Sequence, residues 1–217
     1  MKNVKLNIKI AILILFCAGY SISVAQELKP IKLPAPQTEI GKPLMQALKL
    51  RSSSRSFSSK PLPLQDLSNL LWAADGINRP ETNKRTAPSA MNWQEVDIYV
   101  FLKEGVFLYE PKQHTLLPVL EGDHRALAGT QDFVKDAPVN FVYVADMDKA
   151  KAGNQDDAKM YSAAACGFIA QNVYLYCASE NLVCVIRAFI DKAKISSTLN
   201  LRPAQKPFLG QTIGYAK

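Results

Sequence analysis

One long apolar stretch, residues 157–179, constrains the fold of this 217-residue chain more than any other feature. From Tyr161 onward almost every residue in it is apolar, so it has the length and composition of a helix without a clear polar face. Such a helix has to be covered on most of its sides, and one small domain has difficulty covering them all. The stretch therefore predicts a helix that lies at an interface between subunits.

The segments around this helix alternate irregularly between helical and strand patterns. Helical patterns are found at residues 40–51, 64–74, 123–133 and 191–199. Strand patterns are found at residues 96–102, 106–109, 115–120, 139–145, 182–186 and 207–215, with 115–120 as a further edge strand. The first two strands flank Lys103-Glu104-Gly105 and predict a hairpin. Antiparallel pairs among irregularly ordered helices indicate an α+β fold.

The first 25 residues have the three parts of a secretory signal peptide. Lys2, Lys5 and Lys9 precede an apolar run at residues 10–18. This run is shorter than the roughly 20 residues that a permanent membrane helix needs. Ser23-Val24-Ala25 then offers small side chains to a signal peptidase, so cleavage before Gln26 is expected.

The expected product is an exported, periplasmic chain with no stable membrane span. It begins with an extended, proline-containing arm at residues 26–39 and continues as one domain at residues 40–217. A retained N-terminal anchor and lipidation at Cys17 are the alternatives that the sequence leaves open.

Charge and cysteine usage exclude several classes of function. The formal net charge is +7, and removing three lysines with residues 1–25 leaves +4 without a basic run, so nucleic acid is not an expected partner. Cys166 and Cys177 lie roughly 16 Å apart along the predicted helix, which exceeds disulfide reach. These two residues and Cys184 are expected to be buried thiols. No cysteine or histidine has metal-ligand spacing, so no metal site is expected, and neither His114 nor His124 is given a catalytic role.

Two arginines separated by short hydroxyl side chains follow the first predicted helix. In the run Arg51-Ser52-Ser53-Ser54-Arg55-Ser56-Phe57, forked guanidinium donors and hydroxyl donors lie close together, as a dianionic phosphate requires. A solvated serine loop with two surface arginines has the same composition, so this segment alone does not decide between the two.

A second polar segment, residues 85–94, leads into the first strand of the hairpin. Pro88 fixes a turn, and the small Ser89 and Ala90 allow a planar group to approach the backbone. Asn92 and Gln94 offer donors and acceptors, and they lie on the same side if the segment is extended. Turn-forming residues before a strand are common, so this segment is also indecisive by itself.

Taken in order, these segments resemble the nitroreductase family of FMN-dependent oxidoreductases, and the branch that is most similar is the SagB-type dehydrogenases. The resemblance extends from about Ile40 to Tyr215. It is carried by Arg51-x-Ser-x-Arg55-x-Phe57, Leu70-Leu71-Trp72-Ala73-Ala74-Asp75-Gly76-Ile77-Asn78-Arg79, Arg85-Thr-Ala-Pro-Ser-Ala-x-Asn92-x-Gln94, Gly167-x-x-x-Gln171-Asn172, Leu182-Val-Cys-Val-Ile-Arg187 and Gly214-Tyr215.

The resemblance implies a central mixed, mainly antiparallel sheet flanked by helices, in an intertwined homodimer with FMN between the subunits. Arg51, Ser52, Ser53 and Arg55 would hold the FMN phosphate and the pyrimidine edge of the ring. Pro88, Ser89, Ala90, Asn92 and Gln94 would contact the flavin from the other subunit. Ile186, Arg187 and Ala188 match the loop whose backbone faces the reactive N5 atom.

The sequence departs from the better-known family members at two places. Many members carry Glu-Gly in the loop near N5, whereas this chain has Ala188-Phe189. Many members also continue past Gly214-Tyr215 with basic residues that reach the phosphate, whereas this sequence ends at Lys217. These differences bear on cofactor affinity and on the choice of electron donor more than on the fold.

Three functions are compatible with the resemblance. The first is an FMN oxidoreductase that passes two electrons from a reduced donor to a small organic acceptor such as a nitroaromatic or a quinone. The second is a SagB-like FMN dehydrogenase that oxidises a small molecule or a peptide. The third is a non-catalytic flavin-binding protein.

Overall fold

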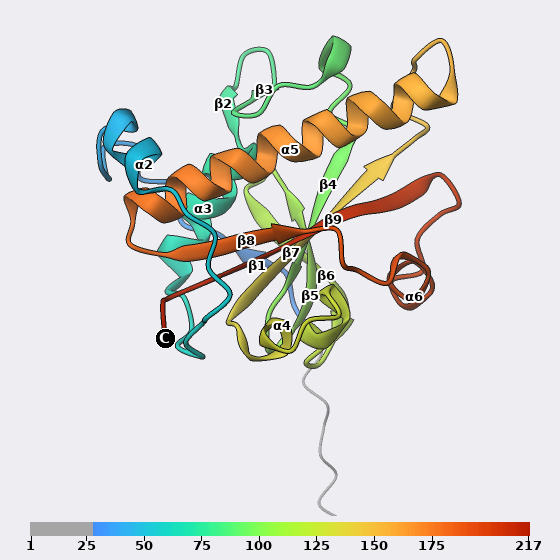
Figure 1. The fold of residues 1–217 in the computed structure, drawn as a ribbon. Helices are drawn as coiled ribbons and strands as arrows, with labels where there is room; N and C mark the ends of the chain where they lie inside the picture. Colours follow the sequence, from blue (N-terminus) through green and yellow to red (C-terminus); the bar gives the residue numbers. More distant parts are fainter. Residues whose placement is uncertain (1–27) are drawn as a thin grey trace, which may run out of the picture.

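The computed structural model describes residues 28–217, so the expected signal peptide at residues 1–25 lies outside the described part of the chain. A seven-stranded sheet forms its centre, with α5 lying across one face (Figure 1). The strands follow the spatial order β1-β6-β5-β4-β7-β9-β8. They are β1 (Ile31–Lys32), β4 (Val96–Phe101), β5 (Gly105–Glu110), β6 (Thr115–Glu121), β7 (Val139–Asp146), β8 (Val183–Arg187) and β9 (Gln205–Gly214).

Five α-helices and a small hairpin surround this sheet within residues 28–217. The helices are α2 (Leu44–Leu50), α3 (Leu64–Asp75), α4 (Phe133–Asp136), α5 (Gln155–Ser179) and α6 (Lys192–Thr198). Two 3-10 turns, η1 (Ala90–Asn92) and η2 (Arg125–Ala128), and the hairpin of β2 (Ile77–Arg79) with β3 (Lys84–Arg85) complete the described chain. None of these helices has the length and apolar character needed to cross a membrane.

The central strand β7 explains why residues 139–145 are almost continuously apolar. All eight residues of β7 are buried, and the strand pairs antiparallel with β4 on one side and β9 on the other. One apolar core packs between the sheet and helices α3 and α5, and a second packs under η2, α4 and α6. Because both faces are covered, neither face of β7 needs polar residues.

All pairings between named strands are antiparallel, which confirms the expected α+β class with a mainly antiparallel sheet. Within the described residues, the one parallel contact is an isolated bridge between Ser53 and Cys184. This bridge places the first arginine-containing segment along the outer edge of β8.

The helix α5 is covered on one side only within this chain. Its start is capped by Asn154, whose side-chain oxygen accepts a hydrogen bond from the backbone N–H of Asp157 at 2.8 Å. One face packs into the core, while Met160, Tyr161 and Phe168 on the other face are about half exposed. A Cβ atom built on Gly167 would have no neighbour within 4 Å. The apolar face predicted to need cover is therefore left open by its own chain.

Several element predictions were wrong in detail. Residues 123–133 do not form one helix, because Gly129 packs extended against the Arg187 guanidinium and separates η2 from α4. Residues 115–120 are not an edge strand, because β1 from the N-terminal arm pairs outside β6. The first helix begins at Leu44 rather than residue 40, since Pro43 precedes its first turn. The β2–β3 hairpin was not predicted.

Candidate functional site

The segment that contains Arg51 and Arg55 is held in place by the edge of the sheet. It leaves α2 at Arg51 and runs beside β8, where the backbone N–H of Ser54 donates to the carbonyl of Cys184 at 3.1 Å. Further along, Phe57 bridges Ala216, and the N–H of Ser58 donates to the carbonyl of Tyr215 at 2.9 Å. The backbone positions of this loop are therefore fixed by the β-sheet rather than by its own serine side chains.

Tyr174 on α5 brings three of the predicted residues together. Its hydroxyl lies 2.7 Å from the Ser53 hydroxyl and accepts a hydrogen bond from the backbone N–H of Ile186 at 3.1 Å. The Arg51 guanidinium lies over the Tyr174 ring, 5.3 Å from its centre. Tyr174 was interpreted from the sequence as a core or interface residue, because a tyrosine in an apolar helix has no local pattern that indicates a functional role.

The cations of this cluster are available to a ligand. Arg51 and Arg55 are both exposed, and neither takes part in the ion pairs found within residues 28–217. Ser52 and Ser53 are exposed as well. Two unpaired guanidinium groups beside hydroxyl and backbone donors form a donor set suited to a phosphate group.

The segment at residues 88–94 is folded more tightly than an extended chain. Met91, Asn92 and Gln94 have φ angles of 48°, 56° and 51°, so the segment is not extended. Asn92 and Gln94 were expected to lie on the same side only if it were extended. The two side chains nevertheless meet, because Gln94 Nε2 donates to Asn92 Oδ1 at 3.2 Å. The backbone N–H of Gln94 also donates to the Ser89 hydroxyl at 3.0 Å. Left-handed conformations at non-glycine residues are uncommon and cluster at functional sites.

One copy of the chain does not bring the two predicted groups together. The Trp93 ring, next to Asn92, packs edge-on against Tyr161 with 5.9 Å between ring centres. The arginine segment instead packs against Tyr174, thirteen residues further along α5 and about 20 Å away along its axis. In Figure 1 this second end of α5 is the one beside α2. Pro88, Ser89 and Gln94 line one small pocket with Ala165 and Ile169 near the middle of α5, so the segment lies on the N-terminal side of Tyr174, where Arg51 packs.

The third predicted group lies where β8 ends. Ile186 is half-buried on the α5 side of the sheet, whereas the Arg187 side chain is buried on the opposite face and donates to Asn140 Oδ1 at 3.2 Å. Gly129 and Gly210 lie against its guanidinium so closely that a Cβ atom at either position would come within 2.8 Å of it. Burial lowers the pKa of Arg187 to about 10. The Arg187 side chain therefore points away from the α5 side of the sheet, where Ile186 lies.

The cysteine prediction is confirmed, since Cys166, Cys177 and Cys184 are free and buried. Burial raises the pKa of the Cys166 thiol to about 12, which keeps it protonated and unreactive. Residues 28–217 contain no group of three or more histidine, cysteine or acidic side chains that could hold a metal ion. His114 is tied into the fold by bonds to Ser68 and Tyr109, at 2.7 and 2.9 Å.

A buried acidic side chain directly follows the 88–94 segment. Glu95 is fully buried, and within residues 28–217 neither of its carboxylate oxygens has a hydrogen-bond partner. Burial raises its pKa above the usual value, and the nearby Ser162 hydroxyl and the cations of Lys149 and Arg85 offset only part of this shift. In the sequence, Glu95 stands out only as a single charged residue directly before an apolar strand.

Glu95→Gln is expected to stabilise the protein at alkaline pH and to leave it nearly unchanged at acidic pH. Because the folded-state pKa of Glu95 is raised, the native protein loses stability as pH rises through that pKa, and glutamine removes this loss. A gain of about 1 kcal/mol would raise Tm by roughly 2–4 °C for a chain of this size. Thermal unfolding at pH 5 and pH 8 measures the difference. Glu81→Gln, on the exposed β2–β3 turn, is the matched control and should show no pH-dependent gain.

Comparison with known proteins gives one family throughout. The model of the nitroreductase family matches residues 48–215. A nitroreductase-family protein of Methanocaldococcus jannaschii is 33% identical over 175 residues, which cover 76% of this chain and 86% of that protein. A crystal structure of a nitroreductase-family protein from Ralstonia eutropha JMP134 has a TM-score of 0.84 at 41% identity, covering 89% of this chain and 92% of that one.

More distant solved structures share the fold alone. A chain of the Escherichia coli microcin synthetase McbBCD complex, solved with truncated pro-MccB17 bound, has a TM-score of 0.66 at 18% identity. The matched region covers 88% of this chain and 79% of that chain. A nitroreductase-family protein from Anabaena variabilis ATCC 29413 has a TM-score of 0.68 at 19% identity, covering 80% of this chain and 38% of that one.

Proposed function

The chain belongs to the nitroreductase family of oxidoreductases, and from this premise we propose that it binds FMN and transfers two electrons from a reduced donor to a small organic acceptor such as a nitroaromatic or a quinone. The observation that carries the proposal is the convergence of Arg51, Ser53 and Ile186 on Tyr174. These residues come from two separate segments that the family resemblance assigns to one ligand.

The donor set of this cluster fits FMN. The exposed guanidinium groups of Arg51 and Arg55 supply the charge that a phosphate requires, and Ser52 and Ser53 supply short donors beside them. Through one hydroxyl, Tyr174 connects the loop proposed to bind the phosphate to the end of β8, which fixes the two segments relative to each other. The bound flavin supplies the redox chemistry, while the chain orients it and limits access of water.

We infer that the working unit is a homodimer. In a single copy, Asn92 and Arg51 lie beside different parts of α5, although the family resemblance assigns both residues to one ligand. Tyr161 and Tyr174 lie six residues before and seven residues after Gly167, at the middle of the exposed face of α5. If two copies of α5 cross near Gly167 about a two-fold axis, the 88–94 segment of one copy lies near Arg51 of the other. Small Gly167 would allow the two helices to approach closely.

The experiment is a visible spectrum of the purified protein, followed by mass spectrometry of the released chromophore and anaerobic mixing with millimolar NADH or NADPH. Oxidised FMN that bleaches on mixing and regains its colour with a quinone is the expected result. A protein without any flavin, even after incubation with FMN, would contradict the proposal.

The same experiment separates the two alternatives. Bound FMN that NADH and NADPH leave oxidised, but that an azoline-containing peptide reduces, would favour a SagB-like dehydrogenase. Bound FMN that no donor or substrate reduces would favour a flavin-binding protein without turnover. Export, inferred from residues 1–25, makes this comparison informative, because nicotinamide cofactors are expected to be scarce outside the cytoplasm.

A further inference from the structure

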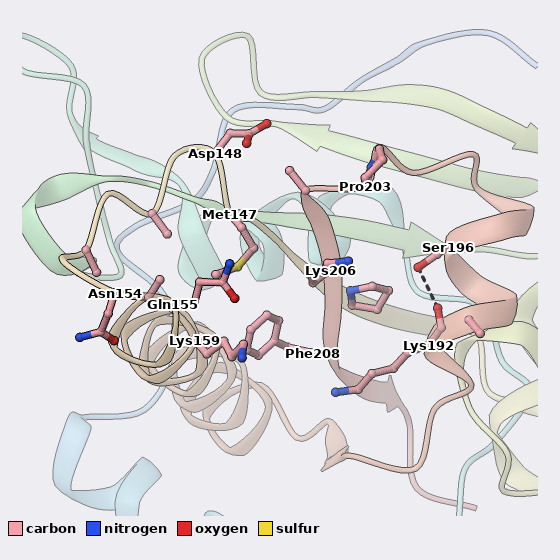
Figure 2. Close-up of a pocket in the computed structure, with 16 residues that line it drawn as sticks. Met147, Asp148, Asn154, Gln155, Lys159, Lys192, Ser196, Pro203, Lys206 and Phe208 are labelled. Atoms are coloured by element: carbon pink, nitrogen blue, oxygen red, sulfur yellow. Dashed lines mark hydrogen bonds between the residues drawn. The ribbon is translucent and has the colours of Figure 1, made fainter.

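A large open pocket lies beside the N-terminal half of α5, away from the arginine segment. It has a volume of about 880 Å³, which is in the range of sites for small molecules, roughly 300–1,000 Å³. Its walls come from the β7–α5 loop, the first turns of α5, helix α6 and the start of β9 (Figure 2). Four separate parts of the chain therefore form one concave surface.

Three lysines gather around this pocket. Lys159 comes from α5, Lys192 from α6 and Lys206 from β9, and Figure 2 shows their side chains arranged around Phe208. The ammonium group of Lys192 lies 5.7 Å from the centre of the Phe208 ring. Three lysines on one concave surface create a positive potential there, which favours binding of an anion.

Nearby acidic groups do not neutralise these lysines. Asp148, the one acidic residue in the pocket wall, is bonded to Arg202 at 2.8 Å. Lys159 contacts Asp156 at 3.2 Å, but both side chains are exposed, and such surface pairs contribute little. Within residues 28–217, Lys192 and Lys206 take part in no ion pair.

The rest of the pocket wall is mainly apolar. Phe208 is half-buried with its ring toward the pocket, and Met147, Pro207, Ala150 and Ala158 line the same space. A small inorganic anion would leave these surfaces in contact with water. A flat organic body would cover them while its charge remained near the ammonium groups.

The pocket adjoins the loop that is expected to face the flavin. Strand β8 ends at Arg187, which pairs with Gly210 on β9, and the chain then reaches Lys192 in the pocket wall within five residues. A molecule between Phe208 and Lys192 would thus lie near the chain that leaves the loop of residues 186–189.

We propose that this pocket binds a small aromatic anion, such as a sulfonate or carboxylate with a planar body, through Lys192, Lys206 and Phe208. That this anion is also the substrate of electron transfer rests on the proposed function, whereas its binding to the pocket does not.

The test uses two dyes with the same aromatic body, titrated into the flavin-saturated protein. Anilinonaphthalene sulfonate carries a negative charge, and N-phenyl-1-naphthylamine lacks it. Lys192→Gln/Lys206→Gln is expected to weaken binding of the sulfonate at least tenfold and to change binding of the neutral dye less than twofold. Lys135→Gln/Lys194→Gln removes two lysines from a different surface depression and should change neither affinity more than twofold.

Three results would overturn the proposal: an unchanged sulfonate affinity in Lys192→Gln/Lys206→Gln, an equal loss in both double variants, or displacement of the sulfonate by stoichiometric FMN. The last result would assign the pocket to the cofactor instead. Repeating the titration without flavin keeps the two proposals separate. A protein that binds no FMN but shows the expected lysine dependence would contradict the proposed function and support the anion site.

Discussion

Arg51→Ala/Arg55→Ala is expected to weaken FMN binding by roughly 10²- to 10⁴-fold while leaving the fold intact. Charge-assisted hydrogen bonds contribute about 1.5–3 kcal/mol each, so losing both guanidinium groups costs about 3–6 kcal/mol of binding free energy. Both side chains are exposed and hold no part of the core, and the backbone of their segment is fixed by β8.

Fluorescence titration of the apoprotein with FMN measures this effect, and circular dichroism checks the fold. Lys103→Ala/Lys112→Ala is the matched control, because it removes the same charge from exposed turns of the β4–β5–β6 region. A dissociation constant within threefold of the wild type in the arginine variant would contradict the phosphate assignment. An equal weakening in the lysine control would mean that net charge, and not this loop, determines affinity.

Phe168→Glu is expected to convert the proposed homodimer into a monomer and, if FMN binds between the subunits as proposed, to remove the flavin at the same time. Phe168 is about half exposed on the open face of α5, one residue from Gly167, so a dimer formed through this face would bury the new carboxylate without a partner. An unpaired buried charge costs several kcal/mol, which corresponds to at least a hundredfold weaker association. Glutamate is a good helix former, so α5 itself should persist.

Sedimentation equilibrium together with the flavin-to-protein ratio measures both consequences. Val119→Glu is the control, because Val119 is also a partly exposed apolar residue but lies on β6, on the far side of the sheet from β8. A Phe168→Glu protein that remains dimeric would place the interface elsewhere. One that is monomeric yet retains stoichiometric FMN would show that a single copy completes the site.

The sequence predicted the regular elements better than the connections between them. The α3 and α5 helices and the β4–β5 hairpin are continuous patterns whose periodicity depends on burial of one or both faces, and the structure confirms them. The turn at Gly129 and the added strand β1 depend on contacts with residues far away in the sequence, Arg187 and Leu116. No local pattern reports such contacts.

The same distinction applies to the site. The family resemblance assigned Arg51, Ser53 and Ile186 to one ligand, and the structure brings all three to Tyr174. It did not identify Tyr174, because a tyrosine in an apolar helix looks like an ordinary core residue, nor Glu95, whose environment is set by tertiary packing. The positive φ angles of Met91, Asn92 and Gln94 were also missed, since asparagine is enriched in this conformation but methionine and glutamine are not.

The way in which the sheet ends on both sides restricts how copies of this protein can associate. On one side the last strand, β1, has only two residues, and on the other β8 is lined by the chain from Ser53 onward. A short edge strand and a lined edge strand offer fewer unpaired backbone groups than long open strands do, which disfavours open-ended polymerisation by strand addition. Association is directed to helix surfaces, where side-chain fit rather than generic main-chain bonding selects the partner.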